Sequence, residues 1–388
     1  MSTYRELLLI EPWDELDFNV PRTDGSTHLE GTLHRIWNTP QTFVTYIVPN
    51  RWRSAIDDHG GKLELGAPHL YEVSEPVDIV YTWVNGEDPD WIRRKRIAES
   101  GLDSATVNGT AVSDSRFESR DELRYSLRSV EHYASWVNRI FIVTDGQMPD
   151  WLNTDHPKVT LVDHREIFRR RESLPVFNSH AIESQLHRIP GLSERYLYLN
   201  DDIMFMRPVE PELFFTSNGM SKYFPSKATL DLSERSARDL PVMSAAKRGR
   251  DFMIERFGRT VTNKFKHTPH SQLKSVLEQF ENEERELFDA VSASQFRHPD
   301  DFSIPSALYH YYAYAESKAI PGEIRYAYMD VAREDARVYL DRLRRRRDLD
   351  VLCLNDTHVE EDQRGEVNRL LAEFFEDRFP VTSSFERF

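Results

Sequence analysis

Four mostly apolar runs are the strongest pattern along this chain. Residues 77–84, 138–146, 158–164 and 195–209 are rich in Val, Ile, Leu and aromatic side chains, and each run is bounded by turn residues. Short apolar runs of this composition are typical of strands that are buried on both faces. We therefore predict four interior strands.

Helical periodicity separates these runs. Leu123, Leu127 and Val130 recur at i, i+4 and i+7 between the first two strands, and residues 182, 186 and 189 form a similar apolar stripe before the fourth. Strands that alternate with helices favour a mostly parallel, doubly wound α/β sheet, and this is the predicted fold class.

The rest of the chain has a less regular pattern of apolar and polar residues. Residues 1–72 mix short apolar runs with turn residues and are predicted to form an N-terminal cap region, with a larger domain at 73–388. Beyond residue 210 the pattern is irregular and more helical, with candidate helices at 270–280, 306–318 and 334–347. We expect a helical insertion at about 210–345.

Composition excludes several classes of protein. The 388 residues carry a net charge of −15, which argues against a nucleic-acid partner, and the single cysteine, Cys353, excludes an intrachain disulfide. The start has no signal-like pattern and no run of about 18 apolar residues occurs, so a cytoplasmic protein without a membrane span is expected. The motifs of P-loop kinases, Rossmann dehydrogenases, zincins and α/β-hydrolases are absent from the sequence.

A polar tripeptide, Asn200, Asp201 and Asp202, interrupts the fourth run. It lies at the predicted carboxyl end of a strand, where open α/β sheets bind their ligands. Adjacent buried carboxylates without partners are costly, and a divalent cation bound through oxygen atoms would remove that cost. The alternative is an Asp pair that caps a turn through main-chain N–H groups.

Two other strand ends carry polar residues. The apolar run 351–354 ends in Asn355 and Asp356, with His358 and Glu360 beyond. Asp78 lies near the start of the first strand and Asn85 just past its end. A nucleotide could sit against that strand, although Asn85 and Gly86 favour a simple turn.

Arginines cluster around the first predicted helix. Arg116 and Arg120 precede it, and Arg124 and Arg128 lie one turn apart on it. Arg binds phosphate oxygens bidentately, so the group could clamp a diphosphate. A solvated helix face, with Arg124 paired to Asp121 or Glu131, fits the spacing equally well.

Two histidines have neighbours that suggest chemistry. Glu183 and His187 are at i and i+4, where an ordinary helix-surface contact is favoured over a catalytic pair. In the segment 266–280, Thr268 resembles an N-cap and Pro269 a first helical residue, which places His270 in the first turn. There it could face a phosphate or take a proton, or it could belong to the cap.

Six segments together resemble the four conserved regions of the Stealth family, in their usual order. These segments are "DIVYTWVNGEDPDW", "RDELRYSLRSVEHYASWVNRIFIVTDGQMPDWLN", "LPVFNSHAIESQLHRIPGLSERYLYLNDDIMF", "HTPHSQLKSVLEQ", "FRHPDDF" and "CLNDTHVEEDQ". The family contains bacterial capsular polysaccharide hexose-1-phosphate transferases and the animal N-acetylglucosamine-1-phosphotransferase. Residues 178–180 and 119–120 depart from the usual family pattern.

The resemblance implies an α/β domain similar to the GT-A nucleotide-sugar fold. It also implies a phosphotransferase that moves hexose-1-phosphate or N-acetylhexosamine-1-phosphate from a nucleoside-diphosphate sugar to a glycan hydroxyl, and that releases a nucleoside monophosphate. The glycan would belong to a capsule or cell surface, and the enzyme could associate peripherally with a polysaccharide-assembly complex. The rival functions are a metal-dependent glycosyltransferase, which releases a nucleoside diphosphate, and a catalytically silent sugar-binding module.

The candidate residue roles combine this resemblance with the residue patterns described above. The catalytic candidates are His270, Asp201, Asp202 and Arg297, with His270 as the preferred general base and Asp201 as its substitute if it is not a ligand. The candidate ligands of Mg²⁺ or Mn²⁺ are Asp202, Asp201 and Asp356. The candidate substrate-binding residues are Asp78, Asn85, Arg116, Glu122, Arg124, Glu183, His187, Asn200, His298 and Asn355.

Overall fold

The computed structural model divides the chain into two units, Met1–Ser74 and Glu75–Phe388. It describes residues 13–36, 44–58, 69–101, 117, 119–236, 239–356, 359 and 362–387. The N-terminal unit contains an antiparallel sheet and a β-ribbon. Its elements are β1 (Trp13–Glu15), β2 (Val20–Pro21), β3 (Thr27–His28), β4 (Leu33–Arg35), β5 (Tyr46–Ile47) and α1 (Pro49–Asp58).

A five-stranded sheet is the centre of the second unit, in the order β14-β9-β6-β7-β8. Its parallel strands are β6 (Val77–Thr82), β7 (Ile140–Thr144), β8 (Val159–Asp163) and β9 (Arg195–Asn200), and β14 (His270–Leu273) is antiparallel to β9. β7 is buried throughout, and β6 and β9 are buried except at their last residues, which explains their continuous apolar runs. The predicted mostly parallel sheet is confirmed.

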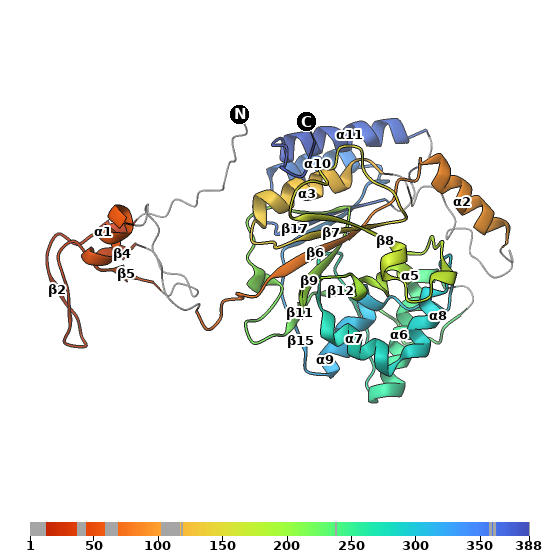
Figure 1. The fold of residues 1–388 in the computed structure, drawn as a ribbon, viewed down its shortest axis with the longest axis horizontal. Helices are drawn as coiled ribbons and strands as arrows, with labels where there is room; N and C mark the ends of the chain where they lie inside the picture. The colour runs from red at the N-terminus through yellow and green to blue at the C-terminus, as the bar shows by residue number, and fades with distance from the viewer. Residues whose placement is uncertain are drawn as a thin grey trace. The chain divides into compact units, whose positions relative to one another are not determined.

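Helices cover both sides of this sheet, as the doubly wound prediction requires (Figure 1). On one side lie α3 (Glu122–Tyr133), α10 (Ala336–Arg345) and α11 (Arg364–Arg378). On the other lie α5 (Ser179–Glu183), α6 (Pro241–Phe257), α7 (Lys274–Glu283), α8 (Arg285–Ser292) and α9 (Tyr309–Ala315). The unit also contains α2 (Pro89–Ser100) and α4 (His164–Ile167). Within the described residues, every helix is too short or too polar to cross a bilayer.

A second sheet is connected to the first by Asp201 and Asp202. β10 (Ile203–Phe205) pairs antiparallel with β17 (Val351–Asn355), which pairs parallel with β16 (Tyr326–Asp330). The run 195–209 is therefore two short strands rather than the single strand that we predicted. Asp201 and Asp202 form the turn between them, so the chain changes sheets at this point.

The predicted helical insertion also contains strands. These are β11 (Ser221–Tyr223), β12 (Pro225–Thr229), β13 (Asn263–Phe265), β14 and β15 (Ala319–Pro321). The helix expected from Thr268 begins only at Lys274, because residues 270–273 pair with β9 instead. Without β14, that side of β9 would leave its main-chain groups unpaired. The helix expected at 179–189 is likewise divided into α5 and a 3-10 turn, Leu186–Arg188.

Candidate active site

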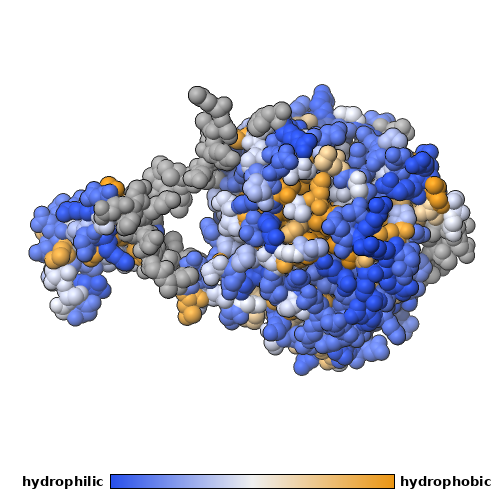
Figure 2. Space-filling view, viewed as in Figure 1, coloured by the Kyte–Doolittle hydropathy of each residue, from blue (hydrophilic) through white to orange (hydrophobic). Residues whose placement is uncertain are grey.

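A single pocket of about 710 Å³ collects most of the predicted site residues. It lies at the carboxyl ends of the parallel strands. Thr82 and Asn200 are the last residues of β6 and β9, and Asp145 and His164 come directly after β7 and β8. This volume is ample for a ligand of the size of a nucleotide sugar. Figure 2 shows apolar residues exposed in the middle of one face of the second unit, with polar residues around them.

Strand register brings two acidic segments together in this pocket. Ile203 of β10 pairs with Cys353 of β17, so Asp202 and Leu354 are the next opposed residues, and the Leu354 N–H donates to the carbonyl of Asp202 at 3.1 Å. Asp356 follows β17 and lines the same pocket. Segments about 150 residues apart in sequence thus form one acidic group.

Three carboxyl groups in this region have raised pKa values. Burial, followed by the charge of Asp202, raises the pKa of Asp201 to about 7. Burial and then Glu122 raise the pKa of Asp202 to about 7, against a hydrogen bond from Cys353 that lowers it. Burial and then Asp201 raise the pKa of Glu122 to about 7. The pocket therefore concentrates more negative charge than its own side chains compensate.

Arg120 offsets part of this charge. Its Nη2 lies 2.8 Å from Oδ2 of Asp356 and its Nη1 lies 4.0 Å from Oε1 of Glu122. Oδ1 of Asp202 and Oδ1 of Asp356 are nevertheless buried without a hydrogen-bond partner in the described part of the chain. Buried carboxylate oxygens without partners are expected where a ligand completes the site.

The carboxylates of the pocket would supply only some of the ligands of a bound Mg²⁺ or Mn²⁺. Among the described residues, no three His, Cys, Asp or Glu side chains are grouped so that they could hold a metal ion. Mg²⁺ is commonly bound through one or two carboxylates, with water and substrate phosphates as the other ligands. Asp202 and Asp356, with their unpartnered oxygens, fit that pattern.

His270 lies on a strand rather than at a helix amino terminus, so the predicted helix-dipole site is wrong. On β14 it is paired with Tyr198 of β9, with ring centroids 6.2 Å apart, and it lines the pocket. Burial, followed by the charge of His267, lowers the pKa of His270 to about 3. The imidazole is therefore neutral at pH 7 and one of its nitrogens has a lone pair.

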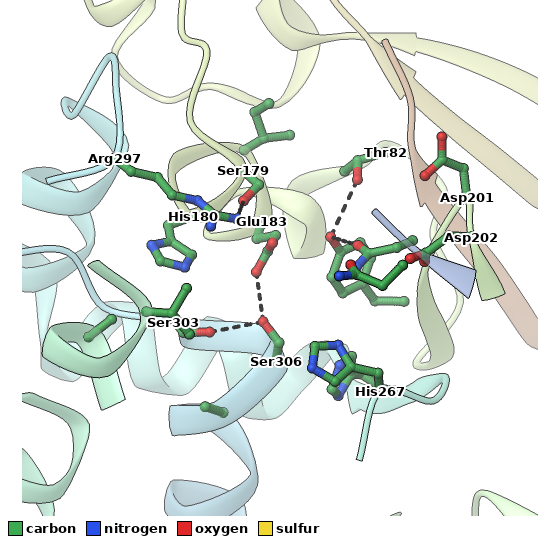
Figure 3. A pocket seen from close by; sticks show the side chains of 18 of the residues that line it. Thr82, Ser179, His180, Glu183, Asp201, Asp202, His267, Arg297, Ser303 and Ser306 are labelled. Atoms are coloured by element: carbon green, nitrogen blue, oxygen red, sulfur yellow. Dashed lines mark hydrogen bonds between the residues drawn. The ribbon is translucent and has the colours of Figure 1, made fainter. Parts of the chain in front are cut away.

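A buried arginine faces the pocket from the side opposite the carboxylates (Figure 3). Nη2 of Arg297 donates to the Ser179 hydroxyl at 2.8 Å, and its Nε is buried without a hydrogen-bond partner in the described residues. Burial lowers the pKa of Arg297, but a guanidinium remains charged at any physiological pH. Beside it, Oε2 of Glu183 accepts a hydrogen bond from Ser306 at 2.9 Å.

Nine of the predicted residues thus line one pocket: Glu122, Glu183, Asn200, Asp201, Asp202, His270, Arg297, Asn355 and Asp356. The side chain of Asn200 accepts from the Tyr198 hydroxyl at 2.8 Å, and that of Asn355 donates to the Tyr328 hydroxyl at 3.0 Å. Arg116 lies outside the described residues.

Asp78 and Asn85 have structural contacts away from the pocket lining. The fully buried Asp78 carboxylate accepts hydrogen bonds from Asn138 at 2.7 Å and from the main-chain N–H of Ser193 at 2.7 Å. It therefore fastens loops at the amino end of β6. Asn85 accepts from the main-chain N–H of Glu87 at 3.0 Å, as expected of a turn residue.

Arg124, His187 and His298 likewise have structural contacts and are not among the residues that line the pocket. Arg124 and Arg128 both bind Glu386 near the carboxyl end, so they anchor that segment to α3. His187 is buried and bonds Glu281 at 2.8 Å instead of Glu183. The ring of His298 accepts from the main-chain N–H of Asp300 at 3.1 Å within a turn.

Some pocket residues had no clear signal in the sequence. They include Thr82, Tyr198, His267, Ser179 and Ser306. Tyr198 could have been found, because it lies two residues before Asn200 and so shares its strand face. Ser306 belongs to a π-helix, Ile304–Leu308, whose position over Glu183 depends on tertiary packing.

Models of four conserved regions of Stealth proteins match this chain in order. Conserved region 1 matches residues 75–103, region 2 matches 116–223, region 3 matches 266–314 and region 4 matches 341–388. The matched segments contain every residue of the acidic group, together with His270 and Arg297.

Curated proteins named exopolysaccharide phosphotransferases are similar in sequence. One from Streptomyces coelicolor is 47% identical over 81% of this chain and 53% of its own length. CpsY of Mycobacterium tuberculosis is 37% identical over 83% of this chain and 60% of its own length. The chain thus spans little more than half the length of these relatives.

Among solved structures, the chain is similar to glycosyltransferases at low scores. The galactosyltransferase LgtC, in complex with donor and acceptor sugar analogs, has 11% identity and a TM-score of 0.38 over 79% of this chain and 96% of that chain. Core-mannan synthase A of Aspergillus fumigatus, in its Mn/GDP form, has 11% identity and a TM-score of 0.33 over 81% of this chain and 89% of that chain.

Proposed function

The chain belongs to the Stealth family, and from this premise we propose that its pocket transfers a sugar-1-phosphate from a nucleoside-diphosphate sugar to a glycan hydroxyl. The glycan would be an exopolysaccharide or another cell-surface polymer, as the names of the relatives suggest. In this reaction the acceptor oxygen attacks the phosphorus that bears the sugar, and a nucleoside monophosphate leaves.

The observation that carries the proposal is the pairing of opposite charges across one pocket. The carboxyl groups of Asp201 and Asp202 lie on one side and the guanidinium of Arg297 on the other, and Asp356 lines the same pocket. A diphosphate between them would meet the guanidinium directly. Its approach to the carboxylates requires a divalent cation, which, when bound, supplies positive charge to the phosphate oxygens.

The chain's own residues account for the remaining steps. Arg297 binds and orients a phosphate oxygen and meets the charge that develops during transfer. Neutral His270 accepts the proton of the attacking hydroxyl as general base. Glu183, held by Ser306, can accept a hydrogen bond from a sugar hydroxyl because a carboxylate oxygen has more than one lone pair.

Product analysis tests this function. We would incubate the full chain with a panel of nucleoside-diphosphate sugars, Mg²⁺ or Mn²⁺ and glycan acceptors, and separate the nucleotide products by chromatography. Nucleoside monophosphate that accumulates in step with a phosphodiester-linked glycan supports the proposal. Nucleoside diphosphate as the exclusive nucleotide product would assign a glycosyltransferase instead.

Loss of chemistry with retention of binding is the third outcome. If donor binds but no product forms under any condition, and Asp202→Ala binds donor as well as the parent chain does, then the pocket is a sugar-binding module.

We place the proposed reaction in the cytoplasm because nucleotide sugars are made there, and association with a polysaccharide-assembly complex at the membrane face belongs to the same proposal.

A further inference from the structure

We propose that His310 is a positioning residue that fixes the tautomer of His270, so that the lone pair of His270 lies on Nε2 and faces the pocket. The catalytic role that this inference gives to His270 rests on the proposed function. The contact itself is a property of the chain, because Nδ1 of His270 lies 3.0 Å from Nε2 of His310. His310 belongs to α9 and does not line the pocket.

The two rings are held at this distance by the elements that carry them. The main-chain N–H of Leu273, at the end of β14, donates to the hydroxyl of Tyr309 on α9 at 2.7 Å. The Gln272 side chain donates to the carbonyl of Pro305 at 2.9 Å. The end of β14 is therefore joined to the start of α9 and to the π-helix Ile304–Leu308 that precedes it. These bonds lie next to the histidine pair, so the contact does not depend on two flexible side chains alone.

One hydrogen must lie between the two nitrogens for them to bond. Burial lowers the pKa of both rings, and each ring's proximity to another histidine lowers it further, so both are neutral. Either His270 donates through Nδ1, which leaves the lone pair on its Nε2, or His310 donates through Nε2, which leaves His270 with an N–H toward the pocket. Only the first arrangement makes His270 a proton acceptor there.

The surroundings of His310 favour the first arrangement. It places the proton of His310 on Nδ1, which is buried without a hydrogen-bond partner among the described residues. The neighbouring rings are those of Phe265 at 4.8 Å, Tyr223 at 5.9 Å and Tyr309 at 5.5 Å. An aromatic ring can accept weakly from an N–H group through its face, whereas it offers a lone pair only the weak C–H groups of its edge.

A neutral partner also sets how His270 responds to substrate. A carboxylate in the position of His310 would raise the basicity of His270 permanently, whereas an imidazole orients it without adding charge. The titratable groups that face His270 are Tyr198 on β9, His267 ahead of β14 and His310 on α9. The negative charge of a bound donor would favour the protonated form of His270 and so raise its basicity.

Nitrogen NMR of the full chain tests the tautomer without any assay. With ¹⁵N-labelled histidine, and with the His270 signals identified by their loss in His270→Gln, we expect the ring proton of His270 on Nδ1 in the parent chain. In His310→Phe, which keeps an aromatic ring but removes the acceptor, we expect the proton to move to Nε2. A parent chain with the proton of His270 on Nε2 overturns the proposal.

Kinetics distinguish positioning from mere packing. We expect His310→Phe to lower kcat about 10- to 100-fold while the donor KM changes less than twofold. His310→Gln, whose amide oxygen can reach the position of Nε2, should recover most of kcat, and Tyr314→Phe on the exposed face of α9 should match the parent. Equal losses in the Phe and Gln variants, with unchanged melting temperatures, would overturn the proposal.

The two proposals can fail separately. If the parent chain releases no nucleoside monophosphate, the proposed function fails, but the nitrogen spectrum still decides the tautomer. If it releases monophosphate and His310→Phe is fully active, the function stands and the role of His310 is refuted.

Discussion

The thiol of Cys353 donates a hydrogen bond to Oδ2 of Asp202 at 3.4 Å, across the pairing of β10 with β17. Cys353 is 1% exposed, and burial, followed by the charge of Asp202, raises the pKa of its thiol well above the usual range. Thiolates rather than thiols react with disulfide reagents. Labelling of the single cysteine should therefore show whether β10 and β17 stay paired.

We expect a chromogenic disulfide reagent at pH 8 to leave the folded chain unlabelled. The same reagent in guanidinium should titrate one thiol per chain, and Cys353→Ala should give none under either condition. A full equivalent of rapid labelling in the native state would mean that β10 and β17 separate readily.

Divalent cations should stabilise the fold through Asp202 and Asp356. Binding to the native state alone, at a concentration about 100 times the dissociation constant, adds about 2.7 kcal/mol to the free energy of unfolding. We expect Mn²⁺ to raise the melting temperature of the parent chain, and both Asp202→Asn and Asp356→Asn to lose most of that increase.

Asp348→Asn is the matched control, because Asp348 is about half exposed and pairs with Arg346. Scanning calorimetry with Mn²⁺ and with a chelator measures the effect. An increase that is equal in all four proteins would place the cation elsewhere.

The Arg297 guanidinium should contribute charge to donor binding. Arg297→Gln keeps a polar amide at this position but removes the positive charge and the guanidinium that donates to Ser179. We expect the dissociation constant of a nucleoside diphosphate to rise about 10- to 100-fold, as measured by titration calorimetry with Mg²⁺ present. Arg333→Gln, on an exposed residue paired with Asp335, should bind like the parent. Unchanged affinity in Arg297→Gln would remove this arginine from the anion site.

Glu281 should make the fold sensitive to acid. Burial alone would raise the pKa of Glu281, but hydrogen bonds and charge from His187 and then Arg188 outweigh it and lower the pKa to about 2, from a usual 4.5. A carboxyl group with a lowered folded pKa adds stability above its unfolded pKa and loses it as the pH falls. The contribution should be complete above pH 4.5 and fade between pH 4.5 and pH 2.

Glu281→Gln tests this dependence by denaturant unfolding at several pH values. At pH 7 we expect a loss of about 2–3 kcal/mol, less than for a completely buried pair, because Arg188 and Arg285 are 32% and 39% exposed. Near pH 2 the variant and the parent should converge. Exposed Glu286→Gln serves as the control, and a difference that does not depend on pH would contradict the assignment.

The sequence was sufficient for the parallel sheet and for the acidic pair. β7 is buried throughout and β6 is buried except at its last residue, so their apolar runs are continuous and visible without knowledge of their neighbours. Asp201 and Asp202 were visible for the converse reason, because two carboxylates within such a run need a physical explanation.

Non-local contacts explain the predictions that were wrong. Thr268 and Pro269 carry ordinary helix-start signals, but the next residues pair with β9, and local chemistry does not reveal that edge. The partner of Arg124 was sought within two helical turns, at Asp121 or Glu131, whereas Glu386 lies 262 residues further along the chain. His310 gave no signal because its meaning depends on the position of α9.

The turn from β9 to β10 has a consequence for anyone who would re-engineer this protein. Residues 200–202 cross from one sheet to the other and at the same time supply the acidic group of the pocket. An insertion or deletion there would slide β10 along β17 by a full residue and turn its side chains to the opposite face. The proposed catalysis and the architecture therefore depend on the same residues, and we expect variation in substrate preference to come from other walls of the pocket.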